Sequence, residues 1–212
     1  MISTIEKNVT QLQAERGFAG EKKKIGIIGG TFNPPHLGHL MIAEQVIDQL
    51  DLDKVYFMPN AKPPHVDPKG AIDPLHRAKM VQAAISGNPH FGIELLEVQR
   101  GGKSYTYQTM LQLKIEHPNY DYYFIIGGDE VNYLKTWYRI DDLLKLVTFV
   151  GVNRPGEPRA NTYPVKWVEV PNLEISSTDI RRRLAAQRTV RYLVPDAVAA
   201  YIAENGLYTD DK

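Results

Sequence analysis

The chain of 212 residues has 25 basic and 25 acidic side chains, a formal net charge of zero, and no cysteine. Without an overall field it has no general attraction to nucleic acid or to an anionic membrane, so any phosphate must be bound by a local set of donors. The absence of thiols excludes disulfides and thiolate metal sites, and with the lack of a long apolar run it predicts a cytoplasmic protein with no nucleic-acid or membrane partner.

We expect residues 1–23 to be an N-terminal extension ahead of the domain. Apolar residues recur there at helical spacing as far as Leu12, and glycines then break the pattern. The pattern fits a short amphipathic helix and equally a disordered segment. We expect the remainder, residues 24–212, to be a single domain.

From Ile25 onward, strand-like apolar runs alternate with helical patterns. The expected strands are 25–28, 55–58, 93–98, 122–126, 148–152 and 165–170. The expected helices are 37–50, 76–86, 106–116 and 131–146. This alternation predicts an α/β protein with an open parallel sheet and helices on both faces. Two further helices, the last starting at Pro195 and stopping at Gly206, should pack back on the sheet.

The stretch 29–39 joins the first strand to the first helix. It begins Gly29-Gly30-Thr31-Phe32 and ends with His36 and His39, three residues apart at the start of the helix. Free backbone N–H groups and the positive end of the helix dipole favour an anion at such a position, which predicts a phosphate site. The alternative is that His36 caps the helix and His39 packs inside. A zinc site is less favoured because no third ligand stands at a recognisable spacing.

A second glycine-containing loop follows the strand that ends at Ile126, and it carries Gly127, Gly128 and Asp129. If this strand and the first are neighbours where the strand order reverses, both loops open onto one cleft. Asp129 could then accept hydrogen bonds from a ribose, or it could be a helix N-cap. Trp137, two turns later, could face the cleft or belong to the core.

A second phosphate cradle is expected at 176–181. Ser176 or Ser177 is a suitable N-cap, with Asp179 placed as in a capping box and Arg181 one turn inside the helix. Hydroxyls, helix amides and a guanidinium would converge on one point, which suits phosphate oxygens. The alternative is an ordinary capped helix.

The run 29–39, joined to Ile175-Ser176-Ser177-Thr178-Asp179-Ile180-Arg181, resembles the nucleotidylyltransferase superfamily with its paired-histidine motif. Five intervening segments narrow the resemblance to bacterial nicotinate-nucleotide adenylyltransferases over about residues 24–208. They are 63–65, 104–106, 126–129, 137–138 and 154–156.

The resemblance implies a Rossmann-like fold that condenses ATP with nicotinate mononucleotide to give deamido-NAD and pyrophosphate. It places the ATP phosphates at the catalytic residues His36, His39 and Arg181 and at Ser176, Ser177 and Thr178, and the nucleotide cleft at Gly29, Gly30, Thr31 and Phe32. Arg154 would lie on the adenine side. On the nicotinate nucleotide side it places His65, Thr106, Asp129, Trp137 and the backbone of Tyr138.

Magnesium would arrive on the ATP phosphates, because no acidic cluster stands near either motif. We expect a protonated His39 to donate to the α-phosphate region in the transition state. Asn33 departs from the aspartate that many members carry, and Val66 from a common basic residue. Alternatives that remain are phosphopantetheine or nicotinamide mononucleotide adenylyltransferase and a catalytically silent nucleotide-binding regulator. Homo-oligomer formation is left open.

Overall fold

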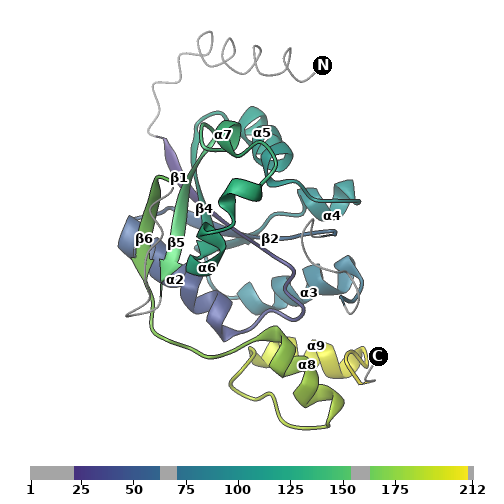
Figure 1. Cartoon of the computed structure of the whole chain (residues 1–212). Helices are drawn as coiled ribbons and strands as arrows, with labels where there is room; N and C mark the ends of the chain where they lie inside the picture. Colours follow the sequence, from purple (N-terminus) through teal and green to yellow (C-terminus); the bar gives the residue numbers. More distant parts are fainter. Residues whose placement is uncertain (1–21, 63–70, 154–162, 210–212) are drawn as a thin grey trace.

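The computed structural model describes residues 22–62, 71–153 and 163–209, and within them six parallel strands form one sheet (Figure 1). The sheet order is β3-β2-β1-β4-β5-β6. The strands are β1 Lys23–Gly30, β2 Lys54–Pro59, β3 Phe91–Ile93, β4 Tyr120–Gly127, β5 Val147–Asn153 and β6 Val165–Glu169. This is the order of a doubly wound Rossmann-like sheet, so the predicted fold class is confirmed.

The strand order reverses beside β1. This strand pairs in parallel with β2 on one side, where Gly30 faces Pro59, and with β4 on the other, where Ile28 faces Ile125. The expected proximity of the two glycine-containing loops is therefore confirmed. Loops that leave β1 and β4 diverge to opposite faces, which opens a crevice at the carboxyl ends of these strands.

Helices cover both faces of the sheet, as predicted. On one face α5 (Thr106–Glu116) packs with Met110 and Leu113 in the cluster that contains Ile27 and Phe124. On the other face α2 (Leu37–Leu50) and α3 (Pro74–Ile85) bury a second apolar cluster. Its helical members include Ala43, Val46, Val81 and Ile85, and its strand members include Val55 and Phe57.

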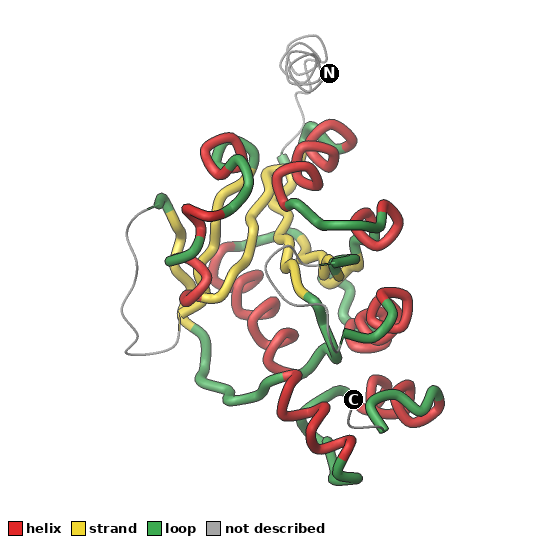
Figure 2. Tube along the Cα trace, turned by 45° about the vertical axis from the view of Figure 1, so that its right-hand side comes forward, coloured by secondary structure: helices red, strands yellow, loops and turns green. Residues whose placement is uncertain are grey.

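The C-terminal helices α8 (Ser177–Ala185) and α9 (Asp196–Glu204) were expected to pack on the sheet, but they pack on α3 instead. A third apolar cluster joins Met80 of α3 to Ile180 of α8 and Val198 of α9. In Figure 1 both helices lie at the lower end of the molecule, toward which the arrow of β5 points, and Figure 2 shows the same grouping beside the C-terminus. They therefore stand next to the carboxyl ends of the strands.

Two predicted elements were wrong. The strand expected at 93–98 is only β3, because the carboxylate of Glu94 accepts the amide of Leu96 (2.8 Å) and turns the chain into the helix α4 (Leu96–Arg100).

The helix expected at 131–146 is three short pieces, α6 (Gly128–Val131), the 3-10 helix η1 (Leu134–Thr136) and α7 (Ile140–Leu143). Extended backbone at Trp137 and a left-handed conformation at Arg139 interrupt it.

The predicted extension 1–23 falls outside the described residues except for its last two, so its helix and the domain division stay predictions. No helix in the described part of the chain is long and apolar enough to cross a membrane. The cytoplasmic location and the oligomeric state also stay predictions.

Candidate active site

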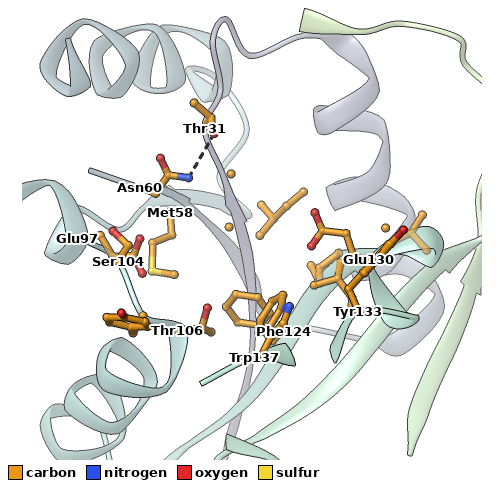
Figure 3. A pocket seen from close by; sticks show the side chains of 18 of the residues that line it. Thr31, Met58, Asn60, Glu97, Ser104, Thr106, Phe124, Glu130, Tyr133 and Trp137 are labelled. Atoms are coloured by element: carbon orange, nitrogen blue, oxygen red, sulfur yellow. Dashed lines mark hydrogen bonds between the residues drawn. The ribbon is translucent and has the colours of Figure 1, made fainter. Parts of the chain in front are cut away.

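A cavity of about 590 Å³ lies at the carboxyl ends of β1, β2 and β4, and Figure 3 shows the side chains that line it. Nine of the residues singled out from the sequence line this cavity. They are Gly29, Gly30, Thr31, His39, Thr106, Gly127, Asp129, Trp137 and Tyr138. The loops after β1 and β4 thus share one cleft, as the strand order requires.

The two histidines begin α2 as a stacked pair. His36 is the N-cap, with extended backbone, and its amide donates to Nδ1 of His39 (3.1 Å). The rings lie 3.6 Å apart between centroids and nearly parallel. His36 is buried and does not line the cavity, whereas half-buried His39 does. His36 thus takes the N-cap position that the alternative interpretation gave it, and the phosphate role of the two histidines stays a prediction.

The hydrogen bond to His39 fixes its tautomer. A backbone amide can only donate, so Nδ1 accepts and the neutral ring carries its proton on Nε2, the nitrogen left for a ligand. Burial lowers the pKa of His36 to about 4. Burial, and secondarily the charge on His36, lowers the pKa of His39 well below its usual range. In the free chain both rings are neutral, so the expected protonation of His39 would need a bound anion.

Phe32 holds His39 from behind instead of lining the cavity. Its buried ring packs edge-on against His39 (5.1 Å) and tilted against Phe57 (5.8 Å). Gly30 makes room for this ring, because a Cβ there would lie 3.0 Å from its Cζ atom. Phe32 thus packs against His39 in the core, and its predicted place in the nucleotide cleft is not among the cavity residues.

The downstream phosphate motif closes on the histidine loop. Arg181 donates from Nη1 to the carbonyl of Asn33 (2.8 Å), and Ser177 donates to the carbonyl of Pro34 (2.8 Å). Ser176 is the N-cap of α8 and accepts the amide of Asp179 (3.1 Å). The two motifs, about 140 residues apart in the sequence, are therefore in direct contact beside the cavity.

Thr178 completes this group at the start of α8. Its hydroxyl accepts from Nη2 of Arg181 (3.3 Å). Ser176, Ser177, Thr178 and Arg181 do not line the cavity, so their phosphate role stays a prediction.

Asn33 is held from the C-terminus as well. The hydroxyl of Tyr208 donates to its side-chain oxygen (2.7 Å), and the Asn33 side chain is buried. Burial raises the pKa of Tyr208, which keeps the phenol protonated and able to donate. The amide at position 33 thus serves as an acceptor that needs no negative charge.

The opposite end of the cavity is aromatic. Half-buried Trp137 packs edge-on against Phe124 and Phe149 (both 5.9 Å) and also lines the cavity, so it belongs both to the core and to the site. Tyr138 packs against Tyr105 (5.0 Å), which precedes Thr106 at the start of α5.

Arg139 fixes the loop that carries these aromatic residues. Its guanidinium lies over the ring of Tyr107 in α5 (4.3 Å) and pairs with Asp142 (2.6 Å). The loop at 137–139 is in this way attached to the helix that Thr106 begins.

Asp129 is not a helix N-cap. Gly127 is the N-cap of α6, and Asp129 is the second residue of that helix. Its side chain is exposed at the cavity, and the ribose role stays a prediction. His65 and Arg154 lie outside the described residues. Within the described ranges no group of three or more His, Asp or Glu could hold a metal ion.

Several cavity residues were missed from the sequence, among them Asn60, Glu97 and Tyr133. Asn60 had a signal, since it follows β2, and the carboxyl end of β2 must lie beside that of β1. Glu97 had none, because it stood in a segment assigned to a strand. Its carboxyl group is buried, accepts from Thr109 (2.9 Å) and has a pKa raised by burial.

The pKa of His36 predicts a pH-dependent stability. Between its ordinary value of 6.5 and about 4, the unfolded chain binds a proton that the folded chain does not. The free energy of unfolding therefore falls as pH is lowered through this window, by about 2 kcal/mol between pH 7 and pH 5 for this one group. Urea unfolding at both pH values should show a loss smaller by that amount in His36→Gln. The exposed His90→Gln is the matched control, and an equal loss in wild type and His36→Gln would contradict the prediction.

Comparison with known proteins agrees with this geometry. The cytidylyltransferase-like family model matches residues 27–183. The "Probable nicotinate-nucleotide adenylyltransferase" of Lactiplantibacillus plantarum is 57% identical over 207 residues, which cover 98% of each chain. The nicotinate-nucleotide adenylyltransferase of Bacillus subtilis is 48% identical over 88% of this chain and 98% of its own.

A solved structure supports the fold. The Plasmodium falciparum nicotinic acid mononucleotide adenylyltransferase complexed with NaAD superposes with a TM-score of 0.73 at 20% identity, covering 88% of this chain and 97% of that one. By its sequence relatives and its matching family model, this chain belongs to the nicotinate-nucleotide adenylyltransferase family of cytidylyltransferase-like proteins.

Proposed function

We propose that the chain transfers the adenylyl group of ATP to nicotinate mononucleotide, giving deamido-NAD and pyrophosphate. The observation that carries this proposal is the direct contact of the two phosphate motifs beside a cavity whose opposite end is aromatic. One end suits a triphosphate and the other a planar ring. The cavity lies where open α/β sheets bind nucleotides.

The reaction needs positioning more than acid–base catalysis. A phosphate oxygen of the mononucleotide forms a bond to the α-phosphorus of ATP as the bond from that phosphorus to the bridging oxygen breaks and pyrophosphate leaves. The attacking oxygen is already anionic at neutral pH, so no strong base is required. What lowers the barrier is in-line alignment and preorganised donors for the charge that develops on pyrophosphate.

The site residues divide these tasks. His39 would donate from Nε2 to the α-phosphate region, and the guanidinium of Arg181 with the hydroxyls of Ser177 and Thr178 would bind the outer phosphates. His36, whose amide fixes the tautomer of His39, would act mainly through that ring. Arg154 stays the proposed adenine-side residue.

The other end of the cavity would take the second substrate. Trp137 would stack on the nicotinate ring, Thr106 and the backbone of Tyr138 would contact its carboxylate, and Asp129 would face a ribose. His65 stays a proposed contact of this nucleotide.

Magnesium would come with the substrate. The described residues offer no metal-binding cluster of their own, and Mg²⁺ commonly binds through the phosphates of its nucleotide. We therefore assign no residue to the metal and route no step through it.

Substrate choice tests the proposed function directly. Pyrophosphate release from ATP should occur with nicotinate mononucleotide and be at least tenfold slower with nicotinamide mononucleotide or phosphopantetheine offered separately. Faster release with either of the latter would change the substrate assignment. Release with none of the three would favour a regulator that binds nucleotide without turning it over.

His39→Ala should lower kcat/KM for ATP at least tenfold, because it removes a donor that acts where charge develops, a loss of about 1.4 kcal/mol or more. Steady-state kinetics of pyrophosphate release measures it. His90→Ala is the control. His90 is exposed and directly precedes β3, so it lies at the amino end of a strand, whereas the cavity lies at the carboxyl ends. A value for His39→Ala within threefold of wild type would remove His39 from the mechanism.

Trp137→Leu should raise KM for nicotinate mononucleotide roughly fivefold to tenfold, because ring stacking contributes about 1 kcal/mol. KM for ATP should change less than twofold. The matched control is Trp167→Leu, the only other tryptophan of the chain, which packs against Gly151 and does not line the cavity. Equal effects of Trp137→Leu on both KM values would argue against a ring-stacking role.

A further inference from the structure

Arg77 of α3 lies under the wall of the cavity with only 1% of its surface exposed. All three guanidinium nitrogens donate to backbone carbonyls. Nη1 donates to Thr31 (2.7 Å), Nη2 to Asn60 (2.7 Å) and Ala61 (3.1 Å), and Nε to Ile72 (3.1 Å). One side chain thus connects the residues that follow β1 with those that follow β2.

Among the described residues no ion pair within 4.0 Å neutralises the charge of Arg77. Asp73 and Tyr208 act on its guanidinium at longer range. Burial lowers the pKa of Arg77, yet a guanidinium remains protonated at neutral pH. Burying a charge in this way is costly, and an apolar side chain of similar volume would often be as stable or more so. Stability alone is therefore a poor reason for an arginine here.

The carbonyls that Arg77 binds belong to the cavity wall. Thr31 and Asn60 both line the cavity, and the Asn60 amide donates to the Thr31 hydroxyl (3.3 Å), as the dashed line in Figure 3 shows. Besides this side-chain bond, the backbone amide of Asn60 donates to the carbonyl of Gly30 (3.0 Å), which is the last contact between the two segments along the sheet. On the far side Arg77 joins their carbonyls.

The same connection extends toward the aromatic end. The amide of Ala61 donates to the hydroxyl of Ser104 (3.3 Å), two residues before Thr106. The position of Ala61 therefore bears on both ends of the cavity. A shift of Ala61 would therefore move residues at both the proposed triphosphate side and the proposed nicotinate side.

We propose that Arg77 is a positioning residue for adenylyl transfer, which holds the Thr31 and Asn60–Ala61 segments at the spacing that aligns the two substrates. The proposal rests on the proposed function. A misalignment of about 1 Å between the reacting atoms lowers the rate of an in-line reaction more than it lowers the affinity for either substrate. The loss should accordingly fall on kcat, with KM for either substrate little changed.

Arg77→Lys tests this, because it keeps the charge but replaces the planar fork by one flexible donor group that cannot reach the same carbonyls together. We expect kcat to fall at least tenfold, with both KM values within threefold of wild type, in protein that is folded by circular dichroism at the assay temperature. Lys79→Met is the matched control. It removes an exposed charge from the same helix and should leave kcat and both KM values unchanged.

Arg77→Met fills the space without a buried charge and serves as the second variant if the lysine protein does not fold. Its kcat should fall at least as far. A folded variant of either kind with kcat within threefold of wild type would overturn the positioning role, as would a loss that only follows the folded fraction. Failure of wild type to release pyrophosphate with any of the three substrates would instead refute the proposed function.

Discussion

Strand β1 is hydrogen-bonded in parallel to β2 on one side and to β4 on the other, and both pairings are possible only if the crossovers leave toward opposite faces of the sheet. The carboxyl ends of three strands then meet at one place with no helix above them. Residues from the loops after all three strands line the cavity. The site is in this sense a consequence of strand order.

Strand order alone does not fix the loop that carries the histidines, and the C-terminal segment binds that loop beside the cavity. Ser177 and Arg181 bind carbonyls just before α2, and Tyr208 binds the side chain of Asn33. Because these helices pack on α3 and not on the sheet, they can contact the histidine loop without entering the core. The second phosphate motif thus reaches the first through a helix that also carries Arg77.

Hydrogen-bond donors gather beside the cavity, although three acidic side chains, Glu97, Asp129 and Glu130, also line it. His36 is buried, His39 is half-buried, and both rings are neutral in the free chain, so the nearby positive charge comes from Arg181 and Arg77 and from the amides at the start of α2 and α8. A net charge of zero over the whole chain is compatible with this, because the donors are fixed by backbone hydrogen bonds at one edge of the sheet. A bound triphosphate would raise the pKa of His39, against the burial that lowers it.

The parallel sheet and the start of α8 could be predicted from the sequence, because buried parallel strands leave continuous apolar runs and N-cap residues are local signals. The shared cleft was predicted only on the condition that β1 and β4 are neighbours, and the contact of the two phosphate motifs followed from the family resemblance. The segment after β4 could not be predicted, since its apolar spacing looks helical while Trp137 and Arg139 adopt non-helical backbone. The strand expected at 93–98 failed for a similar reason, because one side-chain cap at Glu94 outweighed the apolar pattern. The spacing of apolar residues reveals neither the non-helical backbone at 137 and 139 nor the side-chain hydrogen bond at Glu94.

Arg77 shows a different limit. Met80, Val81 and Ala84 follow it at spacings of three, four and seven, so the sequence places this arginine on the buried face of its helix. A charged residue on an apolar helix face could have been noticed in the sequence as a candidate for a special role. Its meaning was not readable, because the partners of Arg77 are carbonyls of Thr31, Asn60 and Ala61, and every residue type carries a carbonyl. A side chain that binds backbone atoms requires no particular residue type at its partners' positions. In a sequence it can be recognised only at its own position, as a charged residue on an apolar face, and in a structure as a buried charge without a side-chain partner.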